Sequence, residues 1–190
     1  NGNLSQDKTH IKLTQKELIG VPASTIAQMK KNKKGEYLVR LRISSLYISI
    51  VRNAKDPNVR RKVMIAFENI QAEKNIKILE QILDLRYKMA KMLGFETYAH
   101  FVLADRMARH PSKSFAFLKD LQKKLTPKMN AELKVLLKLK QKDYPKAKKI
   151  EPWDWRYYAY QLKKTKYAVD TEKIRQYYPL EHVMTKVFFI

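Results

Sequence analysis

Apolar residues recur at helical spacing through most of the chain from residue 56 onward, and this recurrence constrains the fold more than any other feature. Side chains three and four positions apart lie on one face of an α-helix, so each run marks a helix with an apolar side. The first run, which we expect to be buried, consists of Val59, Val63, Phe67 and Ile70; the others contain Ile78, Ile82, Leu85, Met89 and Met92, and then Phe115, Leu118, Leu121, Leu125 and Met129. The pattern predicts a mainly α fold.

Local signals place the ends of these helices. The dipeptide Asp56-Pro57 supplies a capping carboxylate and a proline suited to the first helical position. Gly94 is well placed to end the second helix, and Thr97 can cap a third that runs through about Met107. His110 precedes the next helix and is expected to act locally at its start. The chain from residue 56 therefore reads as one helix after another.

The long helix that begins at Pro111 contains a second proline, Pro127, which is expected to kink or split it. Residues 143–149 form a basic connector, and residues 153–165 return to helix. Asp170 with Glu172 marks one more helix start.

The first quarter of the chain differs from the rest. Residues 11–13 and 37–43 alternate apolar and polar side chains, which predicts a small antiparallel ribbon. Thr14 and Glu17 form a capping box that predicts a short helix opening at Leu18. Gly20-Val-Pro22 ends that helix and admits another turn or two through Met29. We therefore divide the chain into a mixed segment with a short β-ribbon and short helices, residues 1–55, and a helical segment, residues 56–190.

The charge balance is strongly basic, with 40 Lys and Arg against 18 Asp and Glu and a net charge of +22. Such a surface attracts nucleic acid or acidic membranes through long-range electrostatics. The chain contains no cysteine, which excludes disulfides, thiolate zinc sites and cysteine nucleophiles. No apolar stretch reaches the roughly 18 residues needed to span a bilayer.

The sequence also lacks the usual catalytic motifs. A zinc site of the form HExxH needs a glutamate directly after one histidine and a second histidine four positions on. None of the four histidines, His10, His100, His110 and His182, has either neighbour. No serine lies in a nucleophile elbow, and the four glycines cannot form a phosphate loop. His100 is expected to be a packing residue.

Basic and aromatic residues interleave between Trp153 and Tyr167, a composition found in platforms that stack single-stranded nucleic acid. An amphipathic helix with aromatic residues in the core and solvated lysines explains the same tract, and we favour it. Residues 112–150 hold twelve lysines and three acids. This stretch is expected to be a solvated face, or a positive wall beside a channel that binds acidic or C-terminal carboxylate groups of peptides.

Several segments, in order, resemble the thimet oligopeptidase and neurolysin group of zinc metallopeptidases, which includes oligopeptidase A-like enzymes. Their order and spacing carry the resemblance, which covers nearly the whole chain. The segments are Asn3–Asp7, Leu13–Leu18, Gly20–Pro22, Asn58–Arg61, Ala66-Phe67, Leu83–Arg86, Ala90, Leu93–Phe95, Tyr98, Met107-Ala108, Phe117-Leu118, Trp153-Asp154, Tyr157-Tyr158, Tyr167 and Tyr177–Leu180.

The resemblance implies a mostly helical, two-lobed zinc endopeptidase that acts on short peptides, with this chain as part of a channel wall preceding the HExxH region. Zinc is expected in the full-length parent and not in this chain, and no residue is assigned as catalytic, cofactor-binding or metal-binding. The partners implied are the catalytic lobe and short peptides, in the cytoplasm or, alternatively, in mitochondria. The apolar end Val183–Ile190 adds the expectation that the chain is truncated there.

Two other functions stay open at this stage. A standalone basic helical protein would bind nucleic acid or an acidic partner. A catalytically dead homologue would capture peptides without zinc.

Overall fold

The computed structural model describes residues 9–168, 174 and 177–188. Most of the elements are helices, and three short strands lie near the start, so the prediction of a mainly α fold with a small β element is confirmed. The elements in chain order are β1 (His10–Leu13), α2 (Ala23–Ile26), β2 (Lys30–Lys31), β3 (Tyr37–Arg40), α3 (Ser44–Asn53), α4 (Pro57–Glu68), α5 (Ala72–Met92), α6 (Tyr98–Leu103), α7 (Pro111–Asp143), α8 (Trp155–Tyr167) and α10 (Leu180–Phe188).

The predicted ribbon is present and carries one further strand. β1 and β3 pair antiparallel, with Ile11 opposite Val39 and Leu13 opposite Tyr37. β2 pairs with the other edge of β3, so the order is β1-β3-β2. Two residues are too few to show an alternating pattern, which is why β2 gave no sequence signal.

The strand predicted to run to Ile43 ends at Arg40 instead, and Ile43 becomes the N-cap residue of α3. This helix was not predicted, because its β-branched residues favour strands. It forms because Leu46, Tyr47, Ile50 and Val51 fall on one helical face and are all buried.

The capping box forms as predicted, but no helix follows it at Leu18. The Thr14 amide donates to the Glu17 carboxylate at 2.7 Å, and the Glu17 amide donates to the Thr14 hydroxyl at 3.3 Å. Residues 15–20 make only turns, and Gly20 ends them with a φ of +96°. A Cβ at Gly20 would lie 2.4 Å from the carbonyl oxygen of Asn53, so only glycine allows the turn to pack on the end of α3. The further turn expected before Met29 is α2.

One hydrophobic core joins the sheet, α3 and α4. Leu13, Val39, Ile50 and Val63 are fully buried in it, and Phe67 of α4 stacks on Tyr47 of α3 with ring centroids 3.9 Å apart. The predicted stripe of α4 is confirmed, with Val59 and Val63 buried and Phe67 and Ile70 packed partly buried against the cluster. The core therefore extends along the length of α4.

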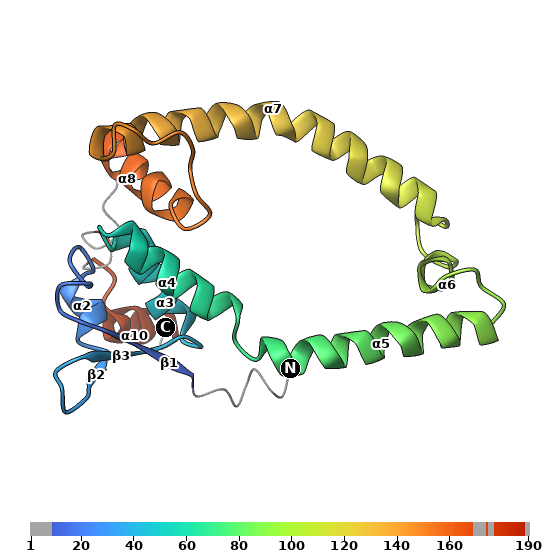
Figure 1. The fold of residues 1–190 in the computed structure, drawn as a ribbon, viewed down its shortest axis with the longest axis horizontal. Coiled ribbons are helices and arrows are strands. Elements are labelled where there is room, and N and C mark those ends of the chain that lie inside the picture. Colours follow the sequence, from blue (N-terminus) through green and yellow to red (C-terminus); the bar gives the residue numbers. More distant parts are fainter. Residues whose placement is uncertain (1–8, 169–173, 175–176, 189–190) are drawn as a thin grey trace.

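Beyond α4 the chain makes a long excursion and returns. In Figure 1, α5 leads away from the core, α6 lies at the far end, and α7 runs back toward α8, which lies beside α3 and α4. The Asp56 carboxylate caps α4 by accepting from the Asn58 amide, and Gly94 follows α5 with a φ of +78°, both as predicted. Thr97 caps α6 as predicted, but α6 ends at Leu103 and does not reach Met107.

The long helix is continuous. α7 runs from Pro111 to Asp143 with Pro127 inside it, so the proline does not split the helix, and Figure 1 shows α7 as one curved rod. The connector and the following helix lie where they were predicted, with α8 at Trp155–Tyr167. The predicted helix start at Asp170 and Glu172 lies outside the described residues. No helix within the described ranges combines the length and the apolarity that crossing a bilayer requires.

Candidate functional site: a buried ionic clamp and two bare helix faces

The buried ionic centre of the molecule joins residues 94 positions apart. Arg60 of α4 and Asp154, the N-cap residue of α8, are both fully buried, and a guanidinium nitrogen of Arg60 lies 2.7 Å from the Asp154 carboxylate. The second carboxylate oxygen lies 2.6 Å from the ammonium of Lys140 on α7. Arg60, Lys140 and Asp154, which we call the clamp, therefore tie together α4, α7 and α8.

Both cations have further partners. Arg60 donates to the carbonyl oxygens of Ala54 and Lys55 at 2.8 Å each, which fixes it to the loop before α4. Its guanidinium also lies over the ring of Tyr157, 4.2 Å from the centroid, while its buried Nε has no hydrogen-bond partner within the described part of the chain. Lys140 donates to the carbonyl of Lys149 at 3.0 Å. A buried charge with this many partners is costly to leave unpaired, so the clamp holds the returning helices against the core.

The aromatic tract packs around the clamp. Tyr158 and Tyr160 are buried, and the Tyr158 hydroxyl donates to Asp143 of α7 at 3.2 Å. Burial raises the pKa of Tyr158 well above its ordinary value, and the carboxylate of Asp143 acts in the same direction. The phenol is therefore a neutral donor. This confirms that α8 places aromatic residues in the core, although Trp155 is half-exposed.

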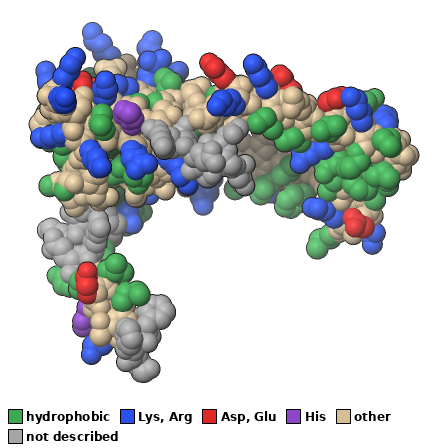
Figure 2. Space-filling view, turned by 90° about the horizontal axis from the view of Figure 1, so that it is seen from below, with side chains coloured by type: hydrophobic (Ala, Val, Ile, Leu, Met, Phe, Trp, Pro, Cys, Tyr) green, Lys and Arg blue, Asp and Glu red, His purple; other side chains and the backbone are tan. Residues whose placement is uncertain are grey.

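Helices α5 and α7 have large apolar faces without a partner among the described residues. On α5 only Ala90 is buried, and on α7 only Pro111 and Leu136. Figure 2, seen from the side of α5, shows hydrophobic side chains gathered toward the α6 end. The bare faces consist of Ile76, Ile78, Leu79, Ile82, Leu83, Leu85, Tyr87, Met89 and Met92 on α5, and of Phe115, Phe117, Leu118, Leu121, Leu125, Met129, Leu133 and Val135 on α7.

The bare face of α5 is too wide to be covered by a single neighbouring element. At about 100° per residue its apolar side chains cover roughly half of the helix circumference or more. A helix with so wide an apolar arc is stable in water only when elements cover it from more than one direction. Patches of this size on a protein surface mark interaction sites.

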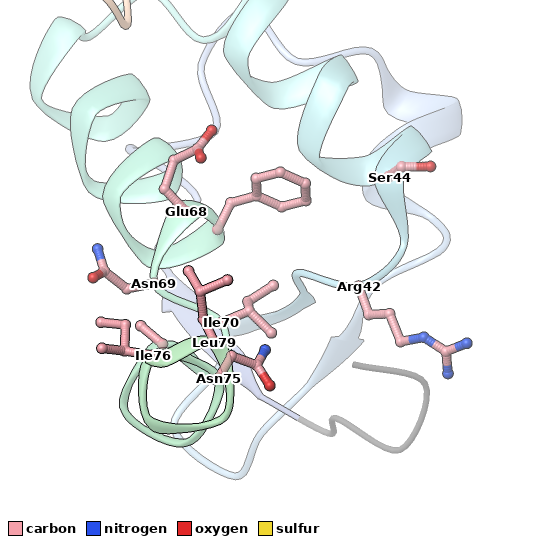
Figure 3. A pocket seen from close by; sticks show the side chains of 10 residues that line it. Arg42, Ser44, Glu68, Asn69, Ile70, Asn75, Ile76 and Leu79 are labelled. Atoms are coloured by element: carbon pink, nitrogen blue, oxygen red, sulfur yellow. The ribbon is translucent and has the colours of Figure 1, made fainter. Parts of the chain in front are cut away.

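A cavity of about 880 Å³ opens where α4 ends and α5 begins. Figure 3 shows Ile70, Ile76 and Leu79 on its α5 side, with Arg42 and Ser44 across from them. Its lining contains no nucleophile paired with a base. Because Ile76 and Leu79 also belong to the bare face of α5, the cavity extends that face and suits an apolar side chain better than a reaction.

His100 and His110 each contact a residue near them in the chain. The His110 Nδ1 accepts from the Ser112 amide at 3.2 Å and so caps α7, as predicted. The half-buried His100 lies with its Nδ1 2.8 Å from the Thr97 hydroxyl, and its ring meets that of His110 edge to face, 4.9 Å between centroids. The sequence did not predict this pairing. His10 lies on β1 and His182 on α10, so the four do not converge.

The described residues do not fit a zinc site. Among them no group of three or more His, Cys, Asp or Glu side chains is arranged to hold a metal ion. A catalytic zinc needs three protein ligands, and the His100–His110 pair offers two rings that already bond to Thr97 and Ser112. We therefore assign no step of chemistry to a metal in this chain.

Comparison with known proteins identifies the chain's relatives. The profile of Peptidase family M3 matches residues 50–190, more than half of the chain. Saccharolysin of Saccharomyces cerevisiae is 33% identical over 96% of this chain and 27% of its own length. Oligopeptidase A of Salmonella typhimurium is 31% identical over 90% of this chain and 27% of its own length. The mitochondrial intermediate peptidase of Coccidioides immitis is 30% identical over 84% of this chain and 20% of its own length.

The chain spans about a quarter of the length of the first of these relatives, and the match includes α4, α7 and α8, which carry the clamp. The resemblance on which the sequence prediction rested is thus confirmed. The chain belongs to peptidase family M3.

Proposed function

We propose that this chain is a non-catalytic scaffold and substrate-channel part of a zinc-dependent metalloendopeptidase that cleaves short peptides, and that it is inactive alone. The bare faces of α5 and α7 carry the proposal, because apolar surface of this extent requires a partner. The partner that fits is the remainder of such a peptidase, since the relatives are named peptidases and the chain corresponds to about a quarter of their length. Zinc would be held by that remainder.

Within this proposal the clamp fixes the angle at which α5 and α7 leave the core. Because α8 lies against α3 and receives the end of α7, displacement of α8 would move the whole returning helix. The helical part from residue 56 onward would then present its bare faces to the catalytic lobe at a set position.

The lysines of α7 support a channel role in one respect. At about 100° per residue, seven of the nine lie on the half of the helix opposite its apolar face. The exceptions are Lys128 and Lys140, and Lys140 is the lysine of α7 that pairs with Asp154. A positive wall that attracts acidic peptides would use the other seven, and weaker peptide binding at high ionic strength would test this role.

The first test is hydrolysis of a short fluorogenic peptide by the 190-residue chain with added zinc. We expect no cleavage above the buffer rate, and chelator-sensitive turnover would contradict the proposal. The second test replaces the matching region of saccharolysin with this chain. We expect the chimera to cleave the peptide with bound zinc.

The chimera also allows a matched pair of variants. Leu85→Asp, on the bare face of α5, should abolish cleavage while leaving the fold of the isolated chain unchanged, because Leu85 is 64% exposed there. Lys124→Asp, on the lysine side of α7, should retain cleavage. Equal activity of both variants would show that the bare faces are not docking surfaces.

The compartment we propose is the cytoplasm, with the mitochondrion as the alternative because one relative is named a mitochondrial intermediate peptidase. One of the two other functions considered from sequence, a basic protein that binds nucleic acid or an acidic partner, receives no support from the relatives.

A further inference from the structure

A second cavity, of about 370 Å³, lies between the sheet and the start of α3, apart from the clamp and the bare faces. Three basic side chains line it, His10, Lys30 and Arg40, one from each strand. Its apolar lining comes from Leu38, Ile43 and Leu46. The volume lies in the lower part of the range of roughly 300–1,000 Å³ found for sites that bind small molecules.

The strand register brings the basic groups together. His10 lies opposite Arg40, and Lys30 lies opposite Leu38, two residues from Arg40 on β3. Residues two apart on a strand point to the same face, so Leu38 and Arg40 share the outer face of the sheet while Tyr37 and Val39 are buried on the other. Figure 2 shows Lys and Arg side chains spread over this half of the molecule.

None of the described residues that line the cavity is acidic. The acids in residues 9–41 are Glu17 and Glu36, and neither lines it. Glu17 lies 2.9 Å from Lys62, and the Glu36 carboxylate accepts from the side-chain Nδ2 of Asn32 at 2.7 Å. Lys30 and Arg40 form no ion pair with any described residue. Lys30 and Arg40 are diagonal neighbours across β2 and β3 and carry the same charge, so an anion bound between them would offset their repulsion.

The apolar lining residues, Leu38, Ile43 and Leu46, form the floor of the cavity and determine which kind of ligand fits it. Leu46 is buried beneath the cavity, while Ile43, at the N-cap of α3, is 39% exposed and offers a side chain for contact. A ligand that places negative charge between Lys30 and Arg40 must lay the rest of its atoms on Leu38, Ile43 and Leu46. We propose that this cavity binds a small aliphatic carboxylate, with its oxygens held by Lys30 and Arg40 and its hydrocarbon part on that floor.

The test uses N-acetyl-leucine as the probe, its neutral amide N-acetyl-leucinamide as the matched ligand, and inorganic phosphate as an anion without a hydrocarbon body. Binding to the isotope-labelled 190-residue chain is followed by NMR shifts of the Leu38, Ile43 and Leu46 methyl groups. We expect saturable shifts with the acid, none with the amide, and weaker binding of phosphate.

The chain offers a matched pair of lysines on β2. Lys30→Gln removes a charge that lines the cavity, whereas Lys31→Gln removes the same charge from a side chain whose ammonium lies over the Tyr37 ring, 4.6 Å from its centroid. Losing a charge-assisted hydrogen bond should weaken binding by about tenfold in Lys30→Gln. Lys31→Gln should leave it within about twofold, because only screened long-range attraction changes. Arg40→Gln should behave like Lys30→Gln, and thermal unfolding confirms that each variant is folded.

Three results would each overturn the proposal. Equal binding of the acid and the amide would show that the basic groups are not used. Binding of phosphate at least as tight as that of N-acetyl-leucine would show that the floor is not used. Equal weakening by Lys30→Gln and Lys31→Gln would show attraction to net charge instead of a site.

Discussion

Replacing Asp154 with asparagine should destabilise the protein more than any other change of a single carboxylate in the described part of the chain. The asparagine keeps the size of the side chain but removes the charge that Arg60 and Lys140 share at 2.7 and 2.6 Å. Arg60 is fully buried, so its positive charge would stay in the interior without a counter-charge. Breaking a buried pair in this way costs about 3–5 kcal/mol, a large part of the roughly 5–15 kcal/mol that stabilises a domain.

Urea unfolding followed by tryptophan fluorescence measures this loss of stability. The signal comes from the region of the clamp, because the two tryptophans of the chain, Trp153 and Trp155, flank Asp154. The matched control is Asp120→Asn, which removes an aspartate 2.7 Å from Lys124 in an exposed pair. That change should cost at most about 1 kcal/mol.

A second variant separates the pairing from the packing. Arg60→Met combined with Asp154→Asn should cost at least about 1 kcal/mol less than the sum of the two single changes, because no unpaired guanidinium is left. Equal losses for Asp154→Asn and Asp120→Asn, or strict additivity in the double variant, would refute the reasoning.

Three further predictions concern titration and capping. Burial raises the pKa of Tyr158, so the stabilising contribution of the neutral phenol is present below the ordinary tyrosine pKa and is lost as pH rises through the raised pKa. Tyr158→Phe should therefore move alkaline unfolding to higher pH. At pH 7 the same change should cost about 1 kcal/mol, because the hydrogen bond to Asp143 is lost. Burial acts to raise the pKa of Glu17, but bonds from Thr14 and Lys62 outweigh it and lower the pKa. The stabilising contribution of the carboxylate is present above the ordinary pKa and is lost as pH falls through the lowered pKa, so Glu17→Gln should lower the melting temperature more at pH 7 than at acidic pH. His110→Ala should remove the cap of α7 and lower the free energy of unfolding by about 1 kcal/mol, with faster amide hydrogen exchange in the first turn of that helix. Asparagine is a good N-cap residue, so His110→Asn should keep most of the stability that His110→Ala loses.

The signals that sequence interpretation read correctly are those in which a side chain acts on backbone within a few residues. Asp56, Thr97 and His110 cap the helices that follow them, and Gly94 ends the one before it. Such contacts form wherever the local conformation allows them, so the local sequence is enough to predict them. The ribbon was predicted for a related reason, because alternation along β1 and β3 follows from one buried face.

Sequence interpretation failed where the surroundings overrode a local preference. The capping box at Thr14 and Glu17 formed without a helix, because the chain turns at Gly20 onto Asn53 at the end of α3. No element was predicted for residues 44–53, and α3 forms there because one of its faces enters the core.

The same distinction between local and long-range contacts applies to the candidate site. By itself the sequence determined the helical class, the absence of an HExxH motif and the resemblance that the family comparison confirmed, because these depend on residue order alone. Only the tertiary structure showed that Arg60 and Asp154 meet across 94 residues with Lys140 as their third member. It also showed that the apolar stripes of α5 and α7 stay bare, whereas the stripe of α4 is buried. All three stripes have the same helical period, and burial is a contact between distant segments, which the sequence of one helix does not specify.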